Sequence, residues 1–441
     1  MPRQGGVPGW PGKSYARSGG EGIVARLLQG PGWLCREAVR DRMRCQVIIH
    51  WGVSSFFGWG VYGLNLALQW GADPDLLPVC SRPIRLSDIS LDPLRALRFQ
   101  SFAAASAEFD QQLREQAQTN RNPVVDVPLL TPLGDDFDVL PTAYGTTLGG
   151  TPTLGVTFFE NPRLAADAVA RAGRFPWIVT GSLWNESVLR RHGVHRVSTI
   201  LQGIDPTLFH RAPRSGLFGD RFLVFSGGKL EHRKGQDLVL AALSEFIRRH
   251  DDVVLVTAWH SPWPQAARSL DSSSRVGPVP MTPEGRVDVT GWAVRNGIPA
   301  DRFVDLGSVP NAQLPPILRE MDVAVFPNRG EGGTNLVAME CMACGVPVIL
   351  SANTGHLDLI DDDVCLPLRD QRPVLLGGPD GVPIPGWGES SVDEIVERLE
   401  QAYGDGNEAR RRGGRAAEKL SGMTWARTAE SLKAVVKDHM G

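Results

Sequence analysis

The stretch Asp322–Leu350 constrains the fold of this chain more than any other part of the sequence. Short apolar runs stand at both ends of it, and between them lie a glycine-rich loop and a segment with helical spacing of apolar residues. The predicted strand, loop, helix and strand are, in order, Asp322–Pro327, Asn328–Asn335, Leu336–Cys344 and Val346–Leu350. Such a unit is typical of a parallel α/β domain.

The loop of this unit has the chemistry of a ligand site. A glycine-rich loop that enters a helix leaves backbone N–H groups free beside the positive end of the helix dipole, which suits a phosphate or a sugar rich in hydroxyls. Glu331 lies in the loop and Glu340 on the helix, so two carboxylates could face one ligand. Turns of this kind also occur in α/β proteins with no such ligand, so the glycine spacing alone leaves both interpretations open.

The residue order resembles the signature of family-4-like glycosyltransferases of the GT-B fold (glycosyl transferases group 1). That signature has an acid, a small glycine-rich loop, a second acid and a helix ending Met-Ala-Cys-Gly-x-Pro-Val. Here Glu331-Gly-Gly-Thr-Asn-Leu-Val-Ala-Met-Glu340 is followed by Cys341-Met-Ala-Cys-Gly-Val-Pro-Val348. The family usually has seven residues between the acids, whereas this chain has eight, with the extra residue around Thr334 and Asn335.

This resemblance implies an α/β protein with two Rossmann-like, doubly wound domains that face each other across a cleft, and 441 residues are enough for two such cores. The predicted parts are a disordered or extended segment over 1–45, an N-terminal acceptor domain over 46–206, a C-terminal nucleotide-sugar-binding domain over 207–420 and a helix over 421–441. Met423–Thr428 resembles the start of the family's last helix, which crosses back to the first domain.

The N-terminal domain has its own glycine-rich loop. Gln46–Trp51 is predicted to be a strand, and Gly52–Gly63 to be the loop after it. The loop is not a GxGxxG fingerprint, which argues against NAD binding. The resemblance implies that this loop approaches the sugar and the diphosphate of the donor. The residues carried over for that contact are Gly58, Trp59 and Gly60.

Glu160 follows the predicted strand Gly155–Phe159, at a place where relatives often have a histidine that faces the sugar. The resemblance therefore offers Glu160 as a candidate catalytic residue in that role. A helix-capping or surface acid is the alternative interpretation.

The C-terminal domain is predicted to open with the strand Arg221–Ser226, followed by Gly228, Lys229 and, five residues on, Lys234. This order resembles the family's Gly-Arg-x(n)-Lys-Gly element, which binds the diphosphate. Cations at a strand end suit a departing diphosphate, because negative charge grows on its oxygens as the glycosidic bond breaks. Lys229 replaces the usual arginine and supplies a point charge in place of a fork. Solvated loop lysines are the alternative.

The resemblance also implies a role for each remaining site residue. Glu331 would contact the hydroxyls of the donor sugar, Glu340 the ribose, and Lys229 and Lys234 the diphosphate. The base would lie against the backbone at Val309. The loop and helix residues carried over as substrate contacts are Gly332, Gly333, Thr334, Asn335 and Leu336.

Composition excludes several other classes of protein. A net charge of −3 implies no polyanion-binding surface, so no nucleic-acid partner is expected. No apolar run is long enough to span a bilayer and no secretory signal is present, which predicts a cytoplasmic protein. Trp33–Arg44 has the pattern of a short basic amphipathic helix, which could contact the inner face of a membrane peripherally or simply be solvated.

No cofactor and no metal ion are expected. Cys341 and Cys344 have CxxC spacing but no second pair to complete a zinc site, so they are interpreted as packing residues. Asp73 and Asp75 match the DxD spacing of the other glycosyltransferase fold, but they follow a predicted helix and are interpreted as a turn.

The expected function is that of a retaining glycosyltransferase that moves a sugar from a nucleotide-diphosphate sugar to a hydroxyl acceptor, which could be a glycan, a lipid-linked group or a protein. A GT-B phosphorylase is disfavoured, because Leu336–Gly345 contains no lysine to hold pyridoxal phosphate. A catalytically silent sugar-nucleotide-binding or scaffold protein of the same fold remains the alternative, since the longer loop and Lys229 both depart from the family pattern.

Overall fold

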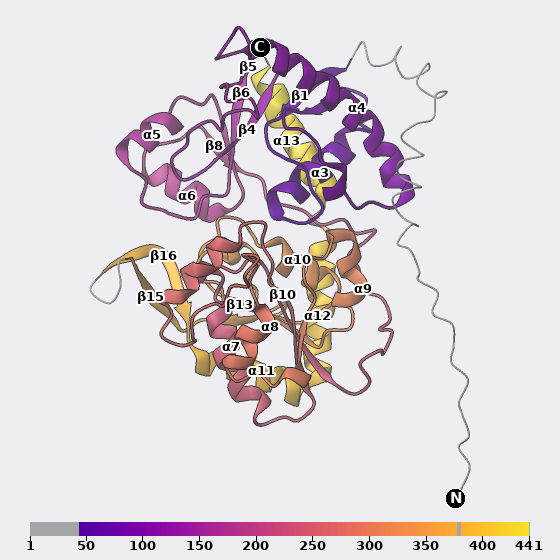
Figure 1. Ribbon diagram of the computed structural model, residues 1–441, viewed down its shortest axis with the longest axis vertical. Helices are drawn as coiled ribbons and strands as arrows, with labels where there is room; N and C mark the ends of the chain where they lie inside the picture. The colour runs from indigo at the N-terminus through magenta and orange to yellow at the C-terminus, as the bar shows by residue number, and fades with distance from the viewer. Residues whose placement is uncertain (1–43, 377–380, 441) are drawn as a thin grey trace, which may run out of the picture.

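A computed structural model of the chain describes residues 44–376 and 381–440. Two α/β domains are stacked along the long axis of the molecule, with the N-terminal domain uppermost in Figure 1. The predicted extension over 1–45 and its helix Trp33–Arg44 lie outside the described residues, apart from their last positions. Cys45 already begins the first strand, one residue before the predicted start.

The N-terminal domain is built on a six-stranded parallel sheet of order β2-β1-β4-β6-β7-β8. Its strands are largely buried apolar runs, as expected for a parallel sheet covered on both faces. They are β1 (Cys45–Ile49), β2 (Leu76–Cys80), β4 (Leu129–Leu133), β6 (Thr153–Thr157), β7 (Ile178–Thr180) and β8 (Val197–Thr199). The helices of this domain are α3 (Gly58–Trp70), α4 (Pro93–Gln116), α5 (Ala166–Ala172) and α6 (Leu183–Arg191).

The start of α3 corrects one sequence-based prediction. Gly58, Trp59 and Gly60 were expected in a loop, but they form the first turn of the helix, after Phe57 in extended conformation. Gly60 allows this arrangement, because a Cβ there would lie 2.5 Å from the Cβ of Ser54. The glycine thus serves close packing of the helix on the preceding loop.

The C-terminal domain has a second six-stranded parallel sheet, of order β11-β10-β9-β12-β13-β14. Numbered within the domain this is the 3-2-1-4-5-6 order of a Rossmann fold, in which ligands bind where the strand order reverses. That point lies between β9 and β12, which carry Lys229 and Glu331 on the loops after them. The strands are β9 (Phe222–Gly227), β10 (Val253–Ala258), β11 (Phe303–Asp305), β12 (Val323–Phe326), β13 (Val348–Ser351) and β14 (Leu366–Leu368).

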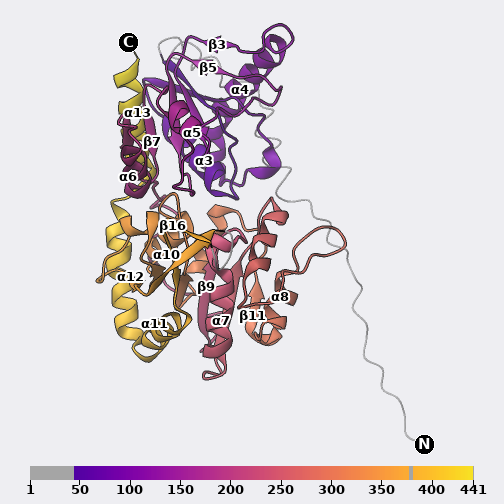
Figure 2. The same cartoon turned by 90° about the vertical axis from the view of Figure 1, so that its left-hand side faces the viewer.

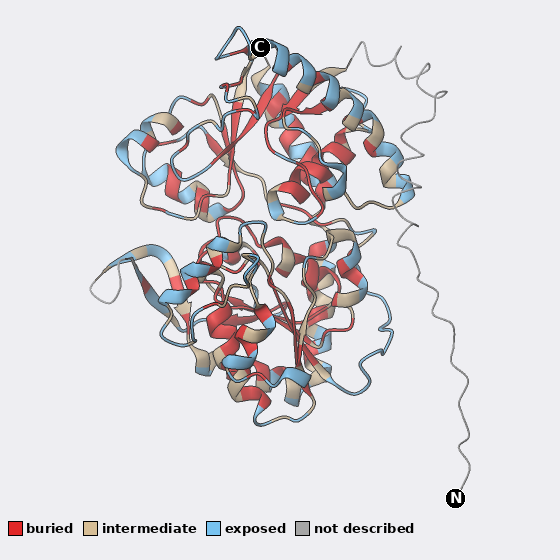
Figure 3. Ribbon diagram, viewed as in Figure 1, coloured by how far each residue is buried: buried red, intermediate tan, exposed pale blue. Residues whose placement is uncertain are grey.

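Helices cover both faces of this sheet, and Figure 3 shows buried residues concentrated along the sheets and on the inward sides of the helices. The helices are α7 (Gln236–Ile247), α8 (Val289–Arg295), α9 (Leu314–Leu318), α10 (Leu336–Ala343), α11 (Val392–Gly404) and α12 (Gly406–Ser421). Cys341 and Cys344 are buried free thiols in the core around α10, as the packing interpretation predicts. No helix among the described residues is both long and apolar enough to cross a bilayer.

An antiparallel hairpin extends from the C-terminal domain, formed by β15 (Gln371–Leu376) and β16 (Val382–Ser390) (Figure 1). The hairpin donates and accepts hydrogen bonds across to the N-terminal domain. Arg163 Nη2 donates to the carbonyl oxygen of Pro383 at 2.5 Å, and the indole N–H of Trp387 donates to the carbonyl oxygen of Glu160 at 2.9 Å. A second small pair, β3 (Val124–Val125) with β5 (Gly149–Gly150), lies within the N-terminal domain.

The last helix, α13 (Trp425–His439), packs against α3 of the N-terminal domain and continues the line of α12 along one side of the molecule (Figure 2). Asp73 and Asp75 hold it there. Lys433 Nζ lies 2.7 Å from Asp73 and 3.0 Å from Asp75, and Lys437 Nζ lies 2.7 Å from Asp75. The two aspartates with DxD spacing therefore bind lysines of the C-terminal helix.

The chain passes between the domains at two neighbouring points. The N–H of Ile204 donates to the carbonyl oxygen of Met423 at 2.9 Å, and the N–H of Trp425 donates back to Ile204 at 3.1 Å. Gly203 permits this contact, because a Cβ there would lie 2.2 Å from the carbonyl carbon of Thr424. The strands of the two sheets span Cys45–Thr199 and Phe222–Leu368, and the domain boundaries near 206 and 420 stay predictions.

Candidate active site

A cavity of about 340 Å³ lies between the two domains. It is lined by α3 and the segment after β6 on the N-terminal side, and by the loops after β9 and β12 on the other. Most of the residues predicted for the site are among those that line it: Gly58, Trp59, Glu160, Gly228, Lys229, Lys234, Val309, Glu331, Gly333, Asn335, Leu336 and Glu340. The fold therefore brings together side chains that are up to 282 positions apart in the sequence, from Gly58 to Glu340.

Three predicted residues lie outside the cavity wall, and each has a packing role. Gly60 faces Ser54, as described above. A Cβ on Gly332 would lie 2.0 Å from the carbonyl oxygen of Phe158, so this glycine permits close contact between the domains. Thr334 is fully buried, and its hydroxyl lies 3.0 Å from the sulfur of Met339. These three residues allow close packing and are not among the residues that line the cavity.

Glu331 is surrounded by hydrogen-bond donors. It is buried on the loop after β12, where the ammonium of Lys234 and the side-chain amide of Asn328 bind its carboxylate, and Arg233 Nη1 lies 3.3 Å away. Burial alone would raise the pKa of this carboxyl, but the Lys234 and Arg233 cations lower the pKa to about 2. Glu331 is therefore a fixed anion at neutral pH.

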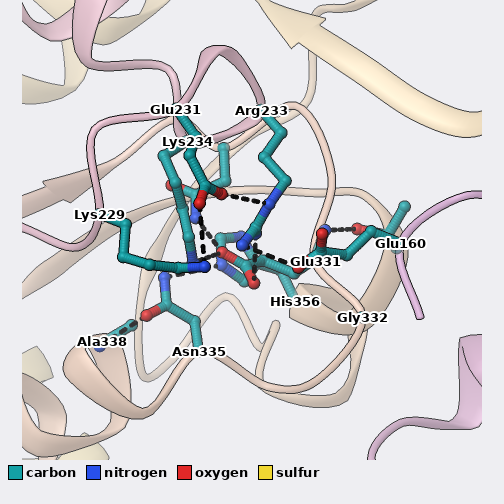
Figure 4. A network of polar contacts seen from close by, with 12 residues as sticks. Glu160, Lys229, Glu231, Arg233, Lys234, Glu331, Gly332, Asn335, Ala338 and His356 are labelled. Carbon is teal, nitrogen blue, oxygen red and sulfur yellow. Dashed lines mark hydrogen bonds and ion pairs between the residues drawn. The ribbon is translucent and has the colours of Figure 1, made fainter. Parts of the chain in front are cut away.

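Arg233 is the main residue that the sequence analysis missed. It lies in the short 3₁₀ turn His232–Lys234, between the two predicted lysines, and its side chain is 10 % exposed. Its guanidinium nitrogens lie 2.7 Å from Glu160 and 2.8 Å from Glu231, in addition to the contact with Glu331 (Figure 4). The available signal was a third cation in the same loop, but only the fold shows that this cation is buried.

Lys229 occupies the outer part of the cavity. Its ammonium is 2.9 Å from Glu231 and 5.4 Å from the ring centroid of Trp263. Trp263 belongs to the segment 259–296, for which the sequence indicated no role, and its ring packs edge-on against Phe57 of the N-terminal domain. This segment therefore contributes one aromatic wall of the cavity.

Glu340 has a different environment from Glu331. It is buried on α10, and its carboxylate accepts a hydrogen bond from Asn311 Nδ2 at 2.5 Å. Burial raises its pKa to about 8, and the Asn311 hydrogen bond opposes this shift only in part. Within the described chain no cation pairs with it, so at neutral pH the protonated form predominates. No sequence pattern indicated that Asn311 contacts Glu340.

The start of α10 is held by Asn335, which has a left-handed backbone with φ of 64°. Its side-chain oxygen accepts from the N–H of Ala338 at 3.4 Å, and its Nδ2 lies 3.1 Å from Nε2 of His356. Burial lowers the pKa of His356 to about 4, so this imidazole is neutral. The loop is one residue longer than the family pattern near Asn335. Asn335 itself caps α10 and lines the cavity.

The amino-acid sequence of this chain is similar to those of known glycosyltransferases. Residues 220–373 match the model of a family described as "Glycosyl transferases group 1". Among curated proteins, a GDP-mannose-dependent alpha-(1-6)-phosphatidylinositol monomannoside mannosyltransferase of Mycolicibacterium smegmatis is 25 % identical over 287 residues, which are 60 % of this chain and 64 % of the relative. A D-inositol 3-phosphate glycosyltransferase of Segniliparus rotundus is 28 % identical over 168 residues, 37 % of this chain and 33 % of the relative. The matches thus span less than two thirds of these relatives.

Solved structures resemble this chain over most of its length. The sucrose-phosphate synthase of Thermosynechococcus elongatus superposes with a TM-score of 0.60 at 16 % identity, covering 90 % of this chain and 99 % of that one. Anabaena Alr3699/HepE in complex with UDP gives 0.56 at 12 % identity, covering 90 % of this chain and 100 % of that one. Together with the two Rossmann-like sheets, these similarities confirm the predicted GT-B fold.

Proposed function

We propose that this chain transfers a sugar from a nucleotide-diphosphate sugar to a hydroxyl acceptor, because it has the GT-B fold and its residues 220–373 match the model of glycosyl transferases group 1. The observation that carries the proposal is the position of Lys229, Lys234, Glu331 and Glu340 around one interdomain cavity. That cavity lies at the reversal of strand order in the C-terminal sheet, where α/β folds bind ligands.

In this proposal the leaving diphosphate is neutralised by the protein itself. Lys229 and Lys234 face the cavity, and the N-terminus of α10 adds backbone N–H groups beside them. Their charges stabilise the oxygens on which negative charge grows as the glycosidic bond breaks. We propose on this basis that no bound metal ion is required, and on the family resemblance that the anomeric configuration is retained.

The two acids would act on different parts of the donor. Glu331 is ionised and can only accept hydrogen bonds, which fits the hydroxyls of the transferred sugar. Glu340 is largely protonated near pH 7, so its carboxyl can donate as well as accept, and this fits the ribose hydroxyls. The base would lie against the backbone at Val309, which also lines the cavity.

The names of the relatives suggest which donors to test first. One relative is GDP-mannose-dependent, and the neighbouring Anabaena protein was solved with UDP and UDP-glucose. Two relatives act on inositol-containing acceptors according to their names, so we propose a glycan or glycolipid hydroxyl as the acceptor. Such a protein would act in the cytoplasm, in peripheral contact with the inner face of a membrane if its acceptor is a lipid.

Incubation of the purified chain with GDP-mannose, UDP-glucose and ADP-glucose, with release of nucleoside diphosphate as the readout, tests the proposal. We expect slow hydrolysis of one donor and faster release when a matching hydroxyl acceptor is added. NMR of the product at the anomeric carbon reports retention or inversion. Tight nucleotide binding without turnover of any donor would instead support a catalytically silent sugar-nucleotide-binding protein.

A further inference from the structure

We propose that Arg233 is a third cation for the diphosphate of the donor, and that the carboxylate of Glu160 occupies its place while the cleft is empty. The inference rests on the proposed function, because it concerns the same cavity. It changes the role of Glu160, which the family resemblance assigned to the donor sugar. In this view Glu160 competes with the donor for a cation.

The contacts of Arg233 come from both domains. Its Nη2 lies 2.7 Å from Glu160, which follows β6 of the N-terminal domain. Its other nitrogens lie 2.8 Å from Glu231 and 3.3 Å from Glu331, both in the C-terminal domain. Figure 4 shows the guanidinium between these carboxylates. The buried Nε of Arg233 is close to Glu231 but makes no hydrogen bond of acceptable geometry.

The charges of this cluster cancel in the empty cleft. Its cations are Lys229, Arg233 and Lys234, and its acids are Glu160, Glu231 and Glu331. Three positive and three negative charges leave a formal sum of zero. A diphosphate is an anion, so it gains little net attraction from the cluster until one carboxylate withdraws.

Glu160 is the acid that can withdraw. Its side chain is 39 % exposed, compared with 17 % for Glu231 and 6 % for Glu331. Each of the other two acids also binds a lysine, whereas Arg233 is the ion-pair partner found for Glu160 among the described residues. Displacing Glu160 therefore breaks one contact and frees Nη2 of Arg233, which can then donate a charge-assisted hydrogen bond to a phosphate oxygen.

The backbone of Glu160 is held in position from both sides. Its carbonyl oxygen accepts from the indole of Trp387 at 2.9 Å, and its N–H donates to Asp135 Oδ1 at 3.2 Å. A rotation of the side chain is therefore sufficient to release Arg233, without a rearrangement of the loop. A ligand with the charge of a diphosphate displaces Glu160 more readily than a nucleoside monophosphate does.

Calorimetric titration of UDP, GDP and the matching monophosphates into the full chain tests this inference. We expect Glu160→Gln to bind the preferred diphosphate about fivefold more tightly than the wild type, because the partly exposed ion pair no longer competes. The affinity for the monophosphate should change less. In an Arg233→Met background the same Glu160→Gln change should have no effect, because the shared cation is gone.

Asp358→Asn is the matched control. Asp358 Oδ2 accepts from the N–H of Leu183 at 3.0 Å, so it also joins the domains but contacts no cation of the cluster. It should leave diphosphate affinity unchanged. If Arg233→Met melts early, Arg233→Gln serves as the background, because it also removes the positive charge.

The outcomes of this titration separate the two proposals. Unchanged or weaker diphosphate binding by Glu160→Gln overturns the inference, and so does equal tightening with Arg233 absent or in the Asp358→Asn control. No diphosphate binding by the wild type would overturn the proposed function itself, and with it this inference.

Discussion

The two ends of the central loop and helix place the same residue type in opposite environments. Glu331 and Glu340 are nine positions apart and both are buried, yet the pKa of the first is lowered to about 2 and that of the second is raised to about 8. Lys234 and Arg233 face Glu331, whereas the side-chain partner of Glu340 is the amide of Asn311.

The difference teaches that burial does not by itself decide the charge of an acid. Removal from water raises the pKa of both carboxyls, and only a nearby cation reverses that effect. One cavity therefore holds a fixed anion at one end and a neutral carboxyl at the other. Each variant below changes one of these two carboxyls or a cation beside it.

The largest effect is expected for Lys234→Ala, because this cation sustains the charge of Glu331 and faces the diphosphate. Turnover should fall by about 2–4 kcal/mol of transition-state stabilisation, on the scale of removing a donor to a developing anion. Steady-state kinetics and a melting curve should be recorded together. Lys437→Ala, on the surface of α13, is the control with wild-type turnover. A folded Lys234→Ala variant with normal kcat would remove Lys234 from the site.

Glu331→Gln is expected to lower kcat by about 100-fold while changing the KM for the donor little. Contacts to the reacting sugar strengthen as positive charge develops at its anomeric carbon, so their loss affects the transition state more than the bound substrate. Donor saturation curves for the variant and the wild type measure both constants. Wild-type kcat in this variant would contradict the assignment of Glu331 to the sugar.

Glu340→Ala should act mainly on binding, because it removes both the donor and the acceptor that the protonated carboxyl offers. A ribose contact holds the ground state and the transition state about equally, so the KM for the donor should rise about five- to tenfold with kcat unchanged. Competitive inhibition by the free nucleoside diphosphate should weaken by the same factor. If KM does not move, Glu340 is only a buried acid of α10.

Glu340 also predicts how stability depends on pH. Its folded pKa of about 8 lies above the ordinary value of 4.5, so the folded protein keeps a proton that the unfolded chain has released. Its contribution is complete below pH 4.5 and is lost as pH rises through 8. The Tm of Glu340→Gln relative to the wild type should therefore be higher at pH 9 than at pH 5, by a few degrees. A constant difference in Tm would place the pKa of Glu340 near its ordinary value.

The smallest expected effect is that of EDTA on donor turnover, since lysines and α10 supply the charge that a metal would otherwise supply. Assays with EDTA and with added Mn²⁺ or Mg²⁺ should give equal rates. Loss of activity with rescue by Mn²⁺ would instead require a metal-clamped diphosphate. Asp73 and Asp75 would then have to exchange Lys433 and Lys437 for the ion.

Much of the fold could be predicted because its strands are continuous apolar runs. The predicted strand Arg221–Ser226 differs from β9 by one residue at each end, and the predicted helix Leu336–Cys344 ends one residue later than α10. The hairpin β15–β16 was not predicted, because Gly and Pro interrupt its sequence and its pairing depends on neither strand alone.

Site residues could be predicted only where they belong to a recognisable local sequence pattern. Glu331, Glu340, Lys229 and Lys234 follow a recognisable pattern, and all of them line the cavity. Arg233 depends on a carboxylate 73 positions earlier, at Glu160, and no local pattern records that contact. Gly60 was predicted to contact the ligand, but its lack of a side chain instead allows α3 to pack closely against Ser54.

The paired crossing at Ile204 and Thr424 determines how the two domains can move relative to each other. The two chain segments that connect the domains cross side by side at this point. It therefore acts as a single hinge, or pivot, about which one domain rotates relative to the other. Rotation about that pivot leaves both connections unstretched, whereas sliding one domain over the other would break the two hydrogen bonds of Ile204. The displacement of any contact across the cleft therefore grows with its distance from the pivot.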